Sequence, residues 1–173
     1  MDFLVEGSAA LGVNLNRNQV GKFEQYCEEI IKRNSIANLT NIVGREQIQT
    51  RHFVDSLAAS TVIPTRLLDG GLRVADIGSG LGMPGLPLSI AFPGIQMVLI
   101  DSARKKTSFL RDVVQILKLG NVEIRTGRAE ILAHDRCLRE GFDIVCGRAL
   151  AKLPVLVELM LRFCRGGGLV VAL

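Results

Sequence analysis

The sequence predicts an α/β fold: an open, doubly wound and mostly parallel β-sheet preceded by a helical extension. Three observations predict it. The apolar residues change near residue 70 from helical spacing to short runs, five such runs follow, and helical segments separate them. We expect residues 1–68 to form the extension and residues 69–173 the core that contains the sheet. Both should pack into one compact domain, because 173 residues suit a single hydrophobic core.

The extension is expected to contain two amphipathic helices. In the first, apolar residues recur three and four positions apart, at Val20, Phe23, Cys27, Ile30 and Ile31. The segment from about 45 to 61 has a similar pattern. Between them, residues 33–44 are rich in asparagine and end on a glycine, which is typical of a loop.

The core is expected to alternate strands with helices. Short apolar runs bounded by glycine, proline or aspartate predict strands at 72–78, 97–101, 122–126, 142–147 and 169–173. Residues 104–118 predict the clearest helix, with Gly120 as the left-handed residue just past its end. Strands joined through helices run parallel, and such sheets bind ligands beyond the carboxyl ends of their strands. Residues that directly follow a strand are therefore the candidates for chemistry.

The composition excludes several classes of protein. Hydrophobic residues make up 48% and charged residues 22% of the chain, as in an ordinary folded domain. No run of eighteen apolar residues predicts a membrane span, and the first residues lack the features of a secretory signal. Four cysteines without a C-x-x-C pair predict buried free thiols in a reducing cytoplasm, not disulfides or a metal site. The net charge of +4 is compatible with a polyanionic partner.

A glycine-rich turn follows the first predicted strand and carries the main functional signal. Residues 80–85 read Gly-x-Gly-x-x-Gly, which fits a dinucleotide-binding turn. An acid two residues before an alternating glycine series instead resembles the nucleotide loop of the class I S-adenosylmethionine-dependent methyltransferases; here these residues are Asp76, Gly78, Gly80 and Gly82. In either case Asp101, at the end of the second strand, is placed to accept hydrogen bonds from ribose hydroxyls.

The acid at position 76 favours the second reading. Its carboxylate should point into the cleft, where it suits the ammonium of a methionine group and would repel a pyrophosphate. We therefore favour an S-adenosylmethionine site, with a dinucleotide site and an unliganded turn as the alternatives. Asp101 and Ser102 also have a structural alternative, because they could end the strand and cap the helix that begins near residue 104.

Several motifs together resemble one bacterial family. They are NLTNIVG (38–44), RHFVDSL (51–57), DIGSGLGMPGLPLSI (76–90), DSARKKTSFL (101–110), GRAE (127–130) and GRAL (147–150). From about residue 20 onward they look like the small-subunit ribosomal RNA guanine-N7 methyltransferases, the RsmG or glucose-inhibited division protein B family. The resemblance implies a cytoplasmic enzyme that transfers a methyl group from S-adenosylmethionine to N7 of a guanine in 16S ribosomal RNA.

The resemblance also assigns residues to the cofactor. Gly78 and Met83 would touch it, Asp101 with Ser102 would hold its ribose end, and Arg148 would lie in the cleft. Taken with the glycine loop, the candidate cofactor-binding residues are Asp76, Gly78, Gly80, Gly82, Met83, Asp101, Ser102, Ala129, Glu130 and Arg148, of which Ala129 and Glu130 would flank the adenine. Chains of this family normally continue into a further helix and an antiparallel strand pair, so we expect C-terminal strands to be missing from this sequence.

The implied chemistry needs no general base. Guanine N7 has a lone pair and no proton, and a methyl sulfonium is already an activated electrophile. Placement of the two groups can supply up to about 7–11 kcal/mol, so no catalytic acid or base and no metal is assigned. Arg148 could hold a phosphate or the guanine O6 edge, or could instead form a salt bridge with a carboxylate such as Asp143 or Glu130.

Basic residues near the cleft predict contacts with RNA. Between residues 102 and 128 there are seven basic and two acidic residues, a local balance of +5. Those at the cleft end of the predicted helix and after the third strand are the candidates, namely Arg104, Lys105, Lys106 and Arg128. Arg111 and Lys118 fit an ordinary solvated helix face better. The expected partner is 16S ribosomal RNA or the small ribosomal subunit, with no membrane and a monomeric protein.

Two other functions remain open at this point. One is an NAD(P)-dependent oxidoreductase, and the other is a non-catalytic module that binds RNA or the ribosome. A hydrolase is excluded, because His52, Asp55 and Ser56 lie on one predicted helix and not around an exposed nucleophile. We expect His52 and Asp55 to form a hydrogen-bonded pair that docks the extension onto the sheet.

Overall fold

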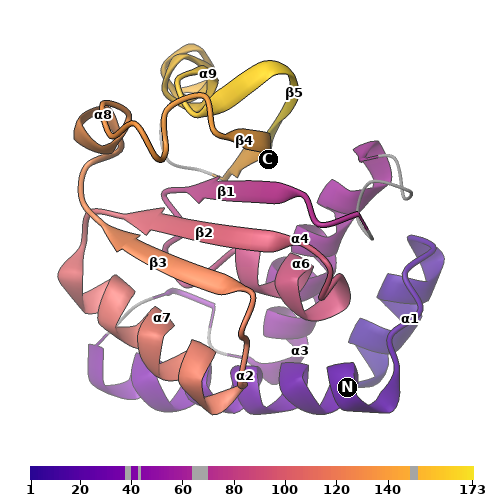
Figure 1. The fold of residues 1–173 in the computed structure, drawn as a ribbon. Coiled ribbons are helices and arrows are strands. Elements are labelled where there is room, and N and C mark those ends of the chain that lie inside the picture. Colours follow the sequence, from indigo (N-terminus) through magenta and orange to yellow (C-terminus); the bar gives the residue numbers. More distant parts are fainter. Residues whose placement is uncertain (38–39, 43, 64–69, 149–151) are drawn as a thin grey trace.

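The sheet that the sequence predicts is present, and its described strand pairs are all parallel. The computed structural model describes residues 1–173 except 38–39, 43, 64–69 and 149–151. The expected domain boundary after residue 68 and parts of the motifs at 38–44 and 147–150 lie outside the described residues. The strands are β1 (Arg73–Ile77), β2 (Gln96–Asp101), β3 (Val122–Thr126), β4 (Phe142–Gly147) and β5 (Cys164–Ala172). Their order across the sheet is β3-β2-β1-β4-β5 (Figure 1).

Strand β5 begins at Cys164, earlier than the predicted start at residue 169. Three consecutive glycines, at 166–168, carry no apolar pattern that could predict a strand. Cys164 pairs with Phe142 and Leu169 pairs with Ile144, so the glycines form an irregularity in the ladder, in which Gly167 has a φ of 77°. Pairing with a neighbouring strand, and not the local pattern, sets the start of β5.

Helices cover both faces of the sheet. Helices α6 (Gly85–Ala91) and α7 (Arg104–Ile116) lie with the N-terminal extension on one face, and α8 (Ala129–Leu132) and α9 (Leu153–Leu161) lie on the other (Figure 1). Successive strand residues alternate between the two hydrophobic clusters: Val74 and Leu99 face the first, whereas Ala75 and Ile100 face the second. This double burial explains why the strands read as nearly continuous apolar runs.

The end of α7 corrects the prediction for Gly120. The left-handed residue is Lys118, with φ 51°. The N–H of Leu119 donates to the carbonyl of Val114, and the N–H of Lys118 donates to the carbonyl of Gln115, which is the Schellman pattern. Burial of Leu119 fixes where the chain must turn, and Lys118 adopts the left-handed conformation at that position in place of a glycine.

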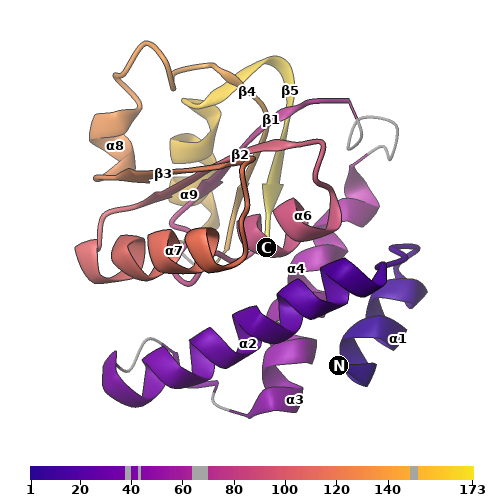
Figure 2. The same ribbon diagram turned by 60° about the horizontal axis from the view of Figure 1, so that its bottom comes forward.

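The extension contains more helix than predicted (Figure 2). It comprises α1 (Asp2–Ala10), α2 (Arg17–Ala37), α3 (Arg45–Ile48), the π-helical segment η1 (Gln49–Val54), α4 (Asp55–Ala58) and the 3-10 segment η2 (Ala59–Val62). Helix α1 was not predicted, and the predicted loop at 33–44 is wrong for residues 33–37, which belong to α2. The buried side chain of Asn34 bonds both the N–H and the carbonyl of Thr40, six residues later, so the last turn of α2 is tied to the segment that follows it.

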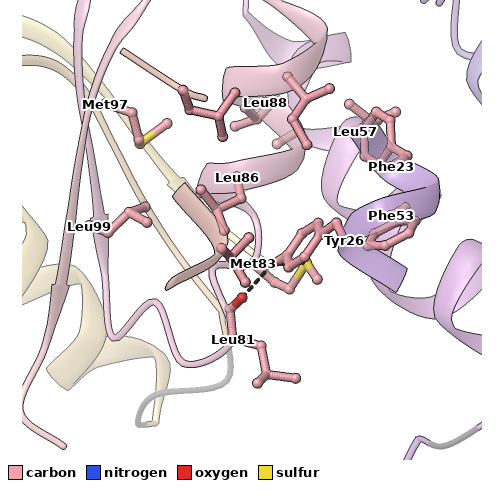
Figure 3. Packing of buried hydrophobic residues seen from close by; sticks show 14 of the residues in the cluster. Phe23, Tyr26, Phe53, Leu57, Leu81, Met83, Leu86, Leu88, Met97 and Leu99 are labelled. Atoms are coloured by element: carbon pink, nitrogen blue, oxygen red, sulfur yellow. Dashed lines mark hydrogen bonds between the residues drawn. The ribbon is translucent and has the colours of Figure 1, made fainter. Parts of the chain in front are cut away.

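The extension and the core share one hydrophobic cluster (Figure 3). The ring of Phe53 lies 5.0 Å from that of Phe23 and 5.3 Å from that of Tyr26, centroid to centroid. The fully buried Tyr26 hydroxyl donates a hydrogen bond to the carbonyl of Leu81 in the glycine-rich turn (Figure 3). Burial of each phenylalanine ring contributes roughly 1.5–3 kcal/mol to folding. Since these rings and the Tyr26 hydrogen bond join the two parts, the glycine-rich turn is fixed against the extension.

Three further expectations concern cysteines, membranes and metals. Cys27, Cys146 and Cys164 are buried free thiols as predicted, but Cys137 is exposed. Among the helices of the described residues, none combines the length and apolar character that crossing a membrane requires. The same part of the chain holds no group of three or more histidine, cysteine, aspartate or glutamate side chains arranged for a metal.

Candidate cofactor and substrate site

The turn after β1 needs glycine at alternate positions. Gly78, Gly80 and Gly82 have φ values of 74°, 60° and 95°, a region that side chains with a Cβ rarely enter. The following glycine, Gly85, is required for a different reason. A Cβ on Gly85 would overlap Leu99 Cδ2 and lie 2.9 Å from Asp76 Oδ2, so α6 can approach the sheet only without it. We call residues 78–85 the glycine loop.

The N–H groups of the glycine loop are largely consumed within the protein. Gly78 and Ser79 donate to the carbonyl of Ile100, Gly80 donates to Asp101 Oδ2, and Gly82 and Met83 donate to the carbonyl of Ser79. A dinucleotide site instead offers such groups, and a helix N-terminus, to a pyrophosphate. The loop is thus poorly suited to an anion, which disfavours the dinucleotide alternative.

Asp76 lies at the N-terminus of α6 and not in the cleft. Its carboxylate is fully buried, its Oδ2 accepts the N–H of Gly85 at 3.0 Å, and Oδ1 has no hydrogen-bond partner among the described residues. The prediction that this side chain points into the cleft is therefore wrong, because position 76 shares the sheet face of Val74, toward α6. Burial raises the pKa of Asp76 from 3.8 to about 7, and the Gly85 N–H and Arg148 partly oppose this rise. The carboxylate thus lies at the positive end of the α6 dipole.

Two cavities meet at the carboxyl ends of β1 and β2. The inner cavity, of about 310 Å³, extends toward α8 and α9; its lining includes Gly78, Asp101, Ser102, Ala129 and Glu130. The loop cavity, of about 520 Å³, extends toward the extension; its lining includes Gly80, Met83, Lys106, Arg148, His52 and Thr40. Gly78, Asp101 and Ser102 line both. Eight of the ten predicted cofactor-binding residues thus line these two cavities, whereas Gly82 and Asp76 line neither.

Asp101 links the glycine loop to α7. Its Oδ2 accepts the N–H of Gly80 and its Oδ1 accepts the N–H of Ala103, both at 2.8 Å. The N-cap of α7 is Ala103, so the cap that the sequence suggested at Ser102 is not formed. Each carboxylate oxygen of Asp101 keeps capacity for a further hydrogen bond from a ligand, since a carboxylate oxygen can accept two. Its structural role and the predicted role toward a ribose are therefore compatible.

Arg148, directly after β4, is held by the extension. Its Nη1 donates to Asp55 Oδ2 at 2.7 Å and to the carbonyl of Arg51 at 3.2 Å, and its Nη2 lies 3.2 Å from His52 Nδ1. All three acceptors belong to, or directly follow, the π-helical segment η1, a type of segment that is frequent at functional sites. The salt bridge foreseen as one alternative is confirmed, and its partner is Asp55, a carboxylate other than the two named as examples.

These contacts fix the protonation of His52. A guanidinium can only donate, so Nδ1 of His52 accepts and its proton must sit on Nε2, which faces Thr40 Oγ1 at 3.4 Å. Burial, together with the positive charge of Arg148, lowers the pKa of His52 from 6.5 to about 4. The predicted hydrogen bond between His52 and Asp55 is not formed. Both side chains instead contact Arg148. The short spacing of His52 and Asp55 on one helix was the available signal for this cluster.

The predicted RNA contacts divide between two places. Arg104 and Arg128 line a third hollow of about 750 Å³ between α7 and α8, and Lys106 lines the loop cavity. Lys105 is exposed and lines none of these hollows. Arg111, which the sequence assigned to a solvated face, lines the third hollow as well.

The two joined cavities fit S-adenosylmethionine better than a dinucleotide. Asp101 offers acceptors where they meet, and the loop offers few free donors for a pyrophosphate. Residues 19–173 match the family model described as rRNA small subunit methyltransferase G. The chain belongs to this family.

Relatives within the rRNA small subunit methyltransferase G family cover almost the whole chain. The protein of that name from Dehalococcoides mccartyi strain CBDB1 is 42% identical over 172 residues, which are 99% of this chain and 72% of the relative. The one from Caldanaerobacter subterraneus is 38% identical over 173 residues, 100% of this chain and 71% of the relative. This chain therefore spans a little over 70% of the length of these relatives.

Solved structures support the fold assigned to this family member. An O-methyltransferase from Bacillus cereus in complex with SAH matches with a TM-score of 0.61 and 21% identity, over 86% of this chain and 65% of that chain. A putative O-methyltransferase from Klebsiella pneumoniae matches with a TM-score of 0.59 and 19% identity, over 85% of this chain and 64% of that chain. At these identities the likeness supports the class I methyltransferase fold and nothing finer.

Proposed function

We propose that the protein transfers the methyl group of S-adenosylmethionine to N7 of a guanine in 16S ribosomal RNA. The observation that carries the proposal is a glycine loop whose N–H groups bond internally, opening onto the hollow between Asp101 and Arg148. Membership of the rRNA small subunit methyltransferase G family supplies the substrate class. The base and the atom are those that the resemblance of the sequence motifs to the guanine-N7 methyltransferases implies.

Different residues around the joined cavities would bind different parts of the cofactor. The backbone of the glycine loop would pack against the cofactor, through Gly78, Gly80, Gly82 and Met83. Asp101 and Ser102 would hold the ribose hydroxyls, and Ala129 and Glu130 of the inner cavity would flank the adenine. Asp76 would act from below, by anchoring the loop through Gly85. When bound, the cofactor supplies a methyl group on a positively charged sulfur.

The protein has little proton chemistry to perform. The lone pair of guanine N7 forms the new bond to the methyl carbon, the carbon–sulfur bond breaks, and its electron pair stays on sulfur as the neutral thioether. The positive charge passes to the guanine ring, and no proton moves. The residues of the loop cavity therefore act by positioning the base and by excluding water.

Arg148 is suited to hold the target guanine by its O6 edge. Its two Nη1 hydrogens and one Nη2 hydrogen are directed at the extension, which leaves Nε–H and one Nη2–H for a ligand. A guanidinium contact to O6 leaves N7 free to react. Lys106, on the same cavity wall, would neutralise a neighbouring phosphate. Lys105, Arg104 and Arg128 would add backbone contacts outside the cavity.

The cellular setting follows from the substrate. We propose that the protein acts in the cytoplasm, on 16S ribosomal RNA or the small ribosomal subunit, as a monomer. Light scattering during gel filtration would measure its mass in solution, and a dimer would contradict this last part.

The decisive experiment measures methyl transfer from radiolabelled S-adenosylmethionine to protein-free 16S ribosomal RNA. We expect labelling of RNA transcribed with guanosine and none of RNA transcribed with 7-deazaguanosine, which lacks the N7 lone pair. Gly78→Val, at a φ of 74°, and Asp101→Ala should abolish labelling, whereas Gly120→Ala, whose added Cβ meets nothing within 4 Å, should not. RNA binding without transfer would support the non-catalytic alternative, and fluorescence of bound NADH would support the oxidoreductase.

A further inference from the structure

We propose that the hollow between α7 and α8 is a binding site for the phosphodiester backbone of the RNA substrate, with Arg111 as a main contact. We call it the edge groove; its lining includes Arg104, Thr107, Arg111, Thr126 and Arg128. This inference rests on the proposed function, because it takes the polyanion to be the RNA that carries the target guanine. It adds a residue that neither the sequence nor the cofactor site singled out.

Three arginines line the edge groove, two from α7 and one from the segment before α8. Arg104 and Arg111 lie on one side of α7, seven residues and so about 10 Å apart along the helix, and Arg128 directly precedes α8. The groove passes the carboxyl end of β3, the edge strand, which lies between α7 and α8 in Figure 1. The arginines are farther apart than the oxygens of one phosphate group. A chain of phosphates fits this spacing better than a single phosphate does.

The charge of the edge groove is not compensated within the described part of the chain. No carboxylate lines it, and none of its three arginines forms a salt bridge to a described carboxylate. The acids nearest in sequence lie elsewhere: Asp112 pairs with Arg33 of α2, Glu130 lines the inner cavity, and Asp101 accepts the N–H groups of Gly80 and Ala103. An uncompensated positive groove attracts a polyanion, and RNA is the polyanion that the reaction supplies.

Arg111 is oriented before any ligand arrives. Its Nη2 donates to Thr126 Oγ1 at 2.8 Å, and Thr126 Oγ1 donates to the buried Thr107 Oγ1 at 2.9 Å. This chain of hydroxyls uses one of the five guanidinium hydrogens and leaves the others for phosphate oxygens. An arginine held in this way loses less side-chain entropy on binding than a freely rotating one. These two hydrogen bonds distinguish Arg111 from an arginine that contacts only solvent.

The edge groove adjoins the place of methyl transfer. It shares Ser102, Gly127 and Arg128 with the inner cavity, and Ser102 also lines the loop cavity. A strand whose guanine enters the loop cavity can therefore continue over Ser102 into the edge groove. Contacts there would position the nucleotides that flank the target, and they would carry no sequence information themselves.

The test is the salt dependence of RNA binding. Binding of protein-free 16S ribosomal RNA to the full chain is measured by filter retention at several KCl concentrations, for the wild type and for Arg104→Gln/Arg111→Gln. Each lost contact to single-stranded phosphate lowers the slope of log Kd against log salt by about 0.7, so the double variant should lower it by about 1.4. The single variant Arg111→Lys keeps the positive charge and should retain most of the wild-type slope. The control is Arg17→Gln, which removes one positive charge from an exposed position outside the groove and should leave the slope unchanged.

Methyl transfer by the same variants separates this inference from the proposed function. We expect the double variant to raise KM for RNA and to leave kcat at saturating RNA and the Kd of S-adenosylmethionine close to the wild-type values. A slope equal to that of wild type, or an equal loss in Arg17→Gln, overturns the edge groove while methyl transfer by the wild type still stands. Failure of the wild type to methylate any RNA would instead count against the proposed function.

Discussion

Replacement of Asp76 by asparagine should change how stability depends on pH. Burial raises the pKa of this carboxyl from 3.8 to about 7, so the folded protein keeps a proton that the unfolded chain has lost. The stabilisation from this proton is complete below about pH 4 and disappears as the pH rises through 7. At about 1.4 kcal/mol per pKa unit, the shift corresponds to roughly 4 kcal/mol of unfolding free energy. Asparagine does not titrate, and its Oδ1 can still accept the N–H of Gly85.

His52 masks this effect in the wild type. Its pKa is lowered from 6.5 to about 4, so the unfolded chain is the state that binds the extra proton over that range. Its contribution is present above pH 6.5 and is lost as the pH falls toward 4, in the opposite sense to that of Asp76. The two contributions largely cancel between pH 4 and 6.5. A flat pH profile of the wild type would therefore not show that both groups have ordinary pKa values.

The difference between variant and wild type isolates Asp76. Urea unfolding followed by circular dichroism at pH 4.5, 6 and 8 gives the unfolding free energy of each protein by linear extrapolation. We expect the value for Asp76→Asn minus that for the wild type to increase by about 3–4 kcal/mol from pH 4.5 to pH 8. Gly120→Ala, which changes no titratable group, is the control and should give a constant difference. A difference for Asp76→Asn that stays constant within about 1 kcal/mol would refute the assignment of a raised pKa.

Three further predictions use the same unfolding assay. For His52→Asn, the unfolding free energy minus that of wild type should fall by about 2–3 kcal/mol from pH 4 to pH 7, and a rise would contradict the tautomer and burial assigned to this ring. Gly85→Ala should lose about 1–3 kcal/mol from overlap with its neighbours. Gly120→Ala should change stability by less than about 1 kcal/mol, and equal losses in both would disprove the packing argument. Tyr26→Phe should lose about 1–3 kcal/mol, because the carbonyl of Leu81 is left buried without its donor; no loss would mean that water replaces the hydroxyl.

Features that depend on a single stretch of chain could be predicted from the sequence. The glycine-rich turn after the first strand was predicted, and in it Gly78, Gly80 and Gly82 adopt positive φ values, which are a local requirement of the backbone. The alternation of strands and helices could also be predicted, because each element follows from the apolar pattern of its own segment. The strand ends therefore located the hollow in which most candidate cofactor-binding residues lie.

Features that depend on distant contacts could not be predicted in this way. The acceptors of Arg148 lie 93–97 residues earlier in the chain, and no pattern around Arg148 announces them. The side-chain direction of Asp76 is a different case, because the strand alternates and position 76 has the parity of Val74. Counting from Val74, which faces α6, would have placed the carboxylate under the loop and not in the cleft.

The contacts of the extension argue that it belongs to the functional site and is not an appendage to it. Tyr26 of α2 supports the glycine loop from below through Leu81, and segment η1 with Asp55 holds Arg148 on the opposite wall of the loop cavity. Thr40 and His52 line that cavity themselves. A methyltransferase core without these helices would keep its strands, but neither the loop nor the arginine would have its present support. Substrate placement is the main task that this chemistry leaves to the protein, so the extension supplies a large part of what makes the site able to act.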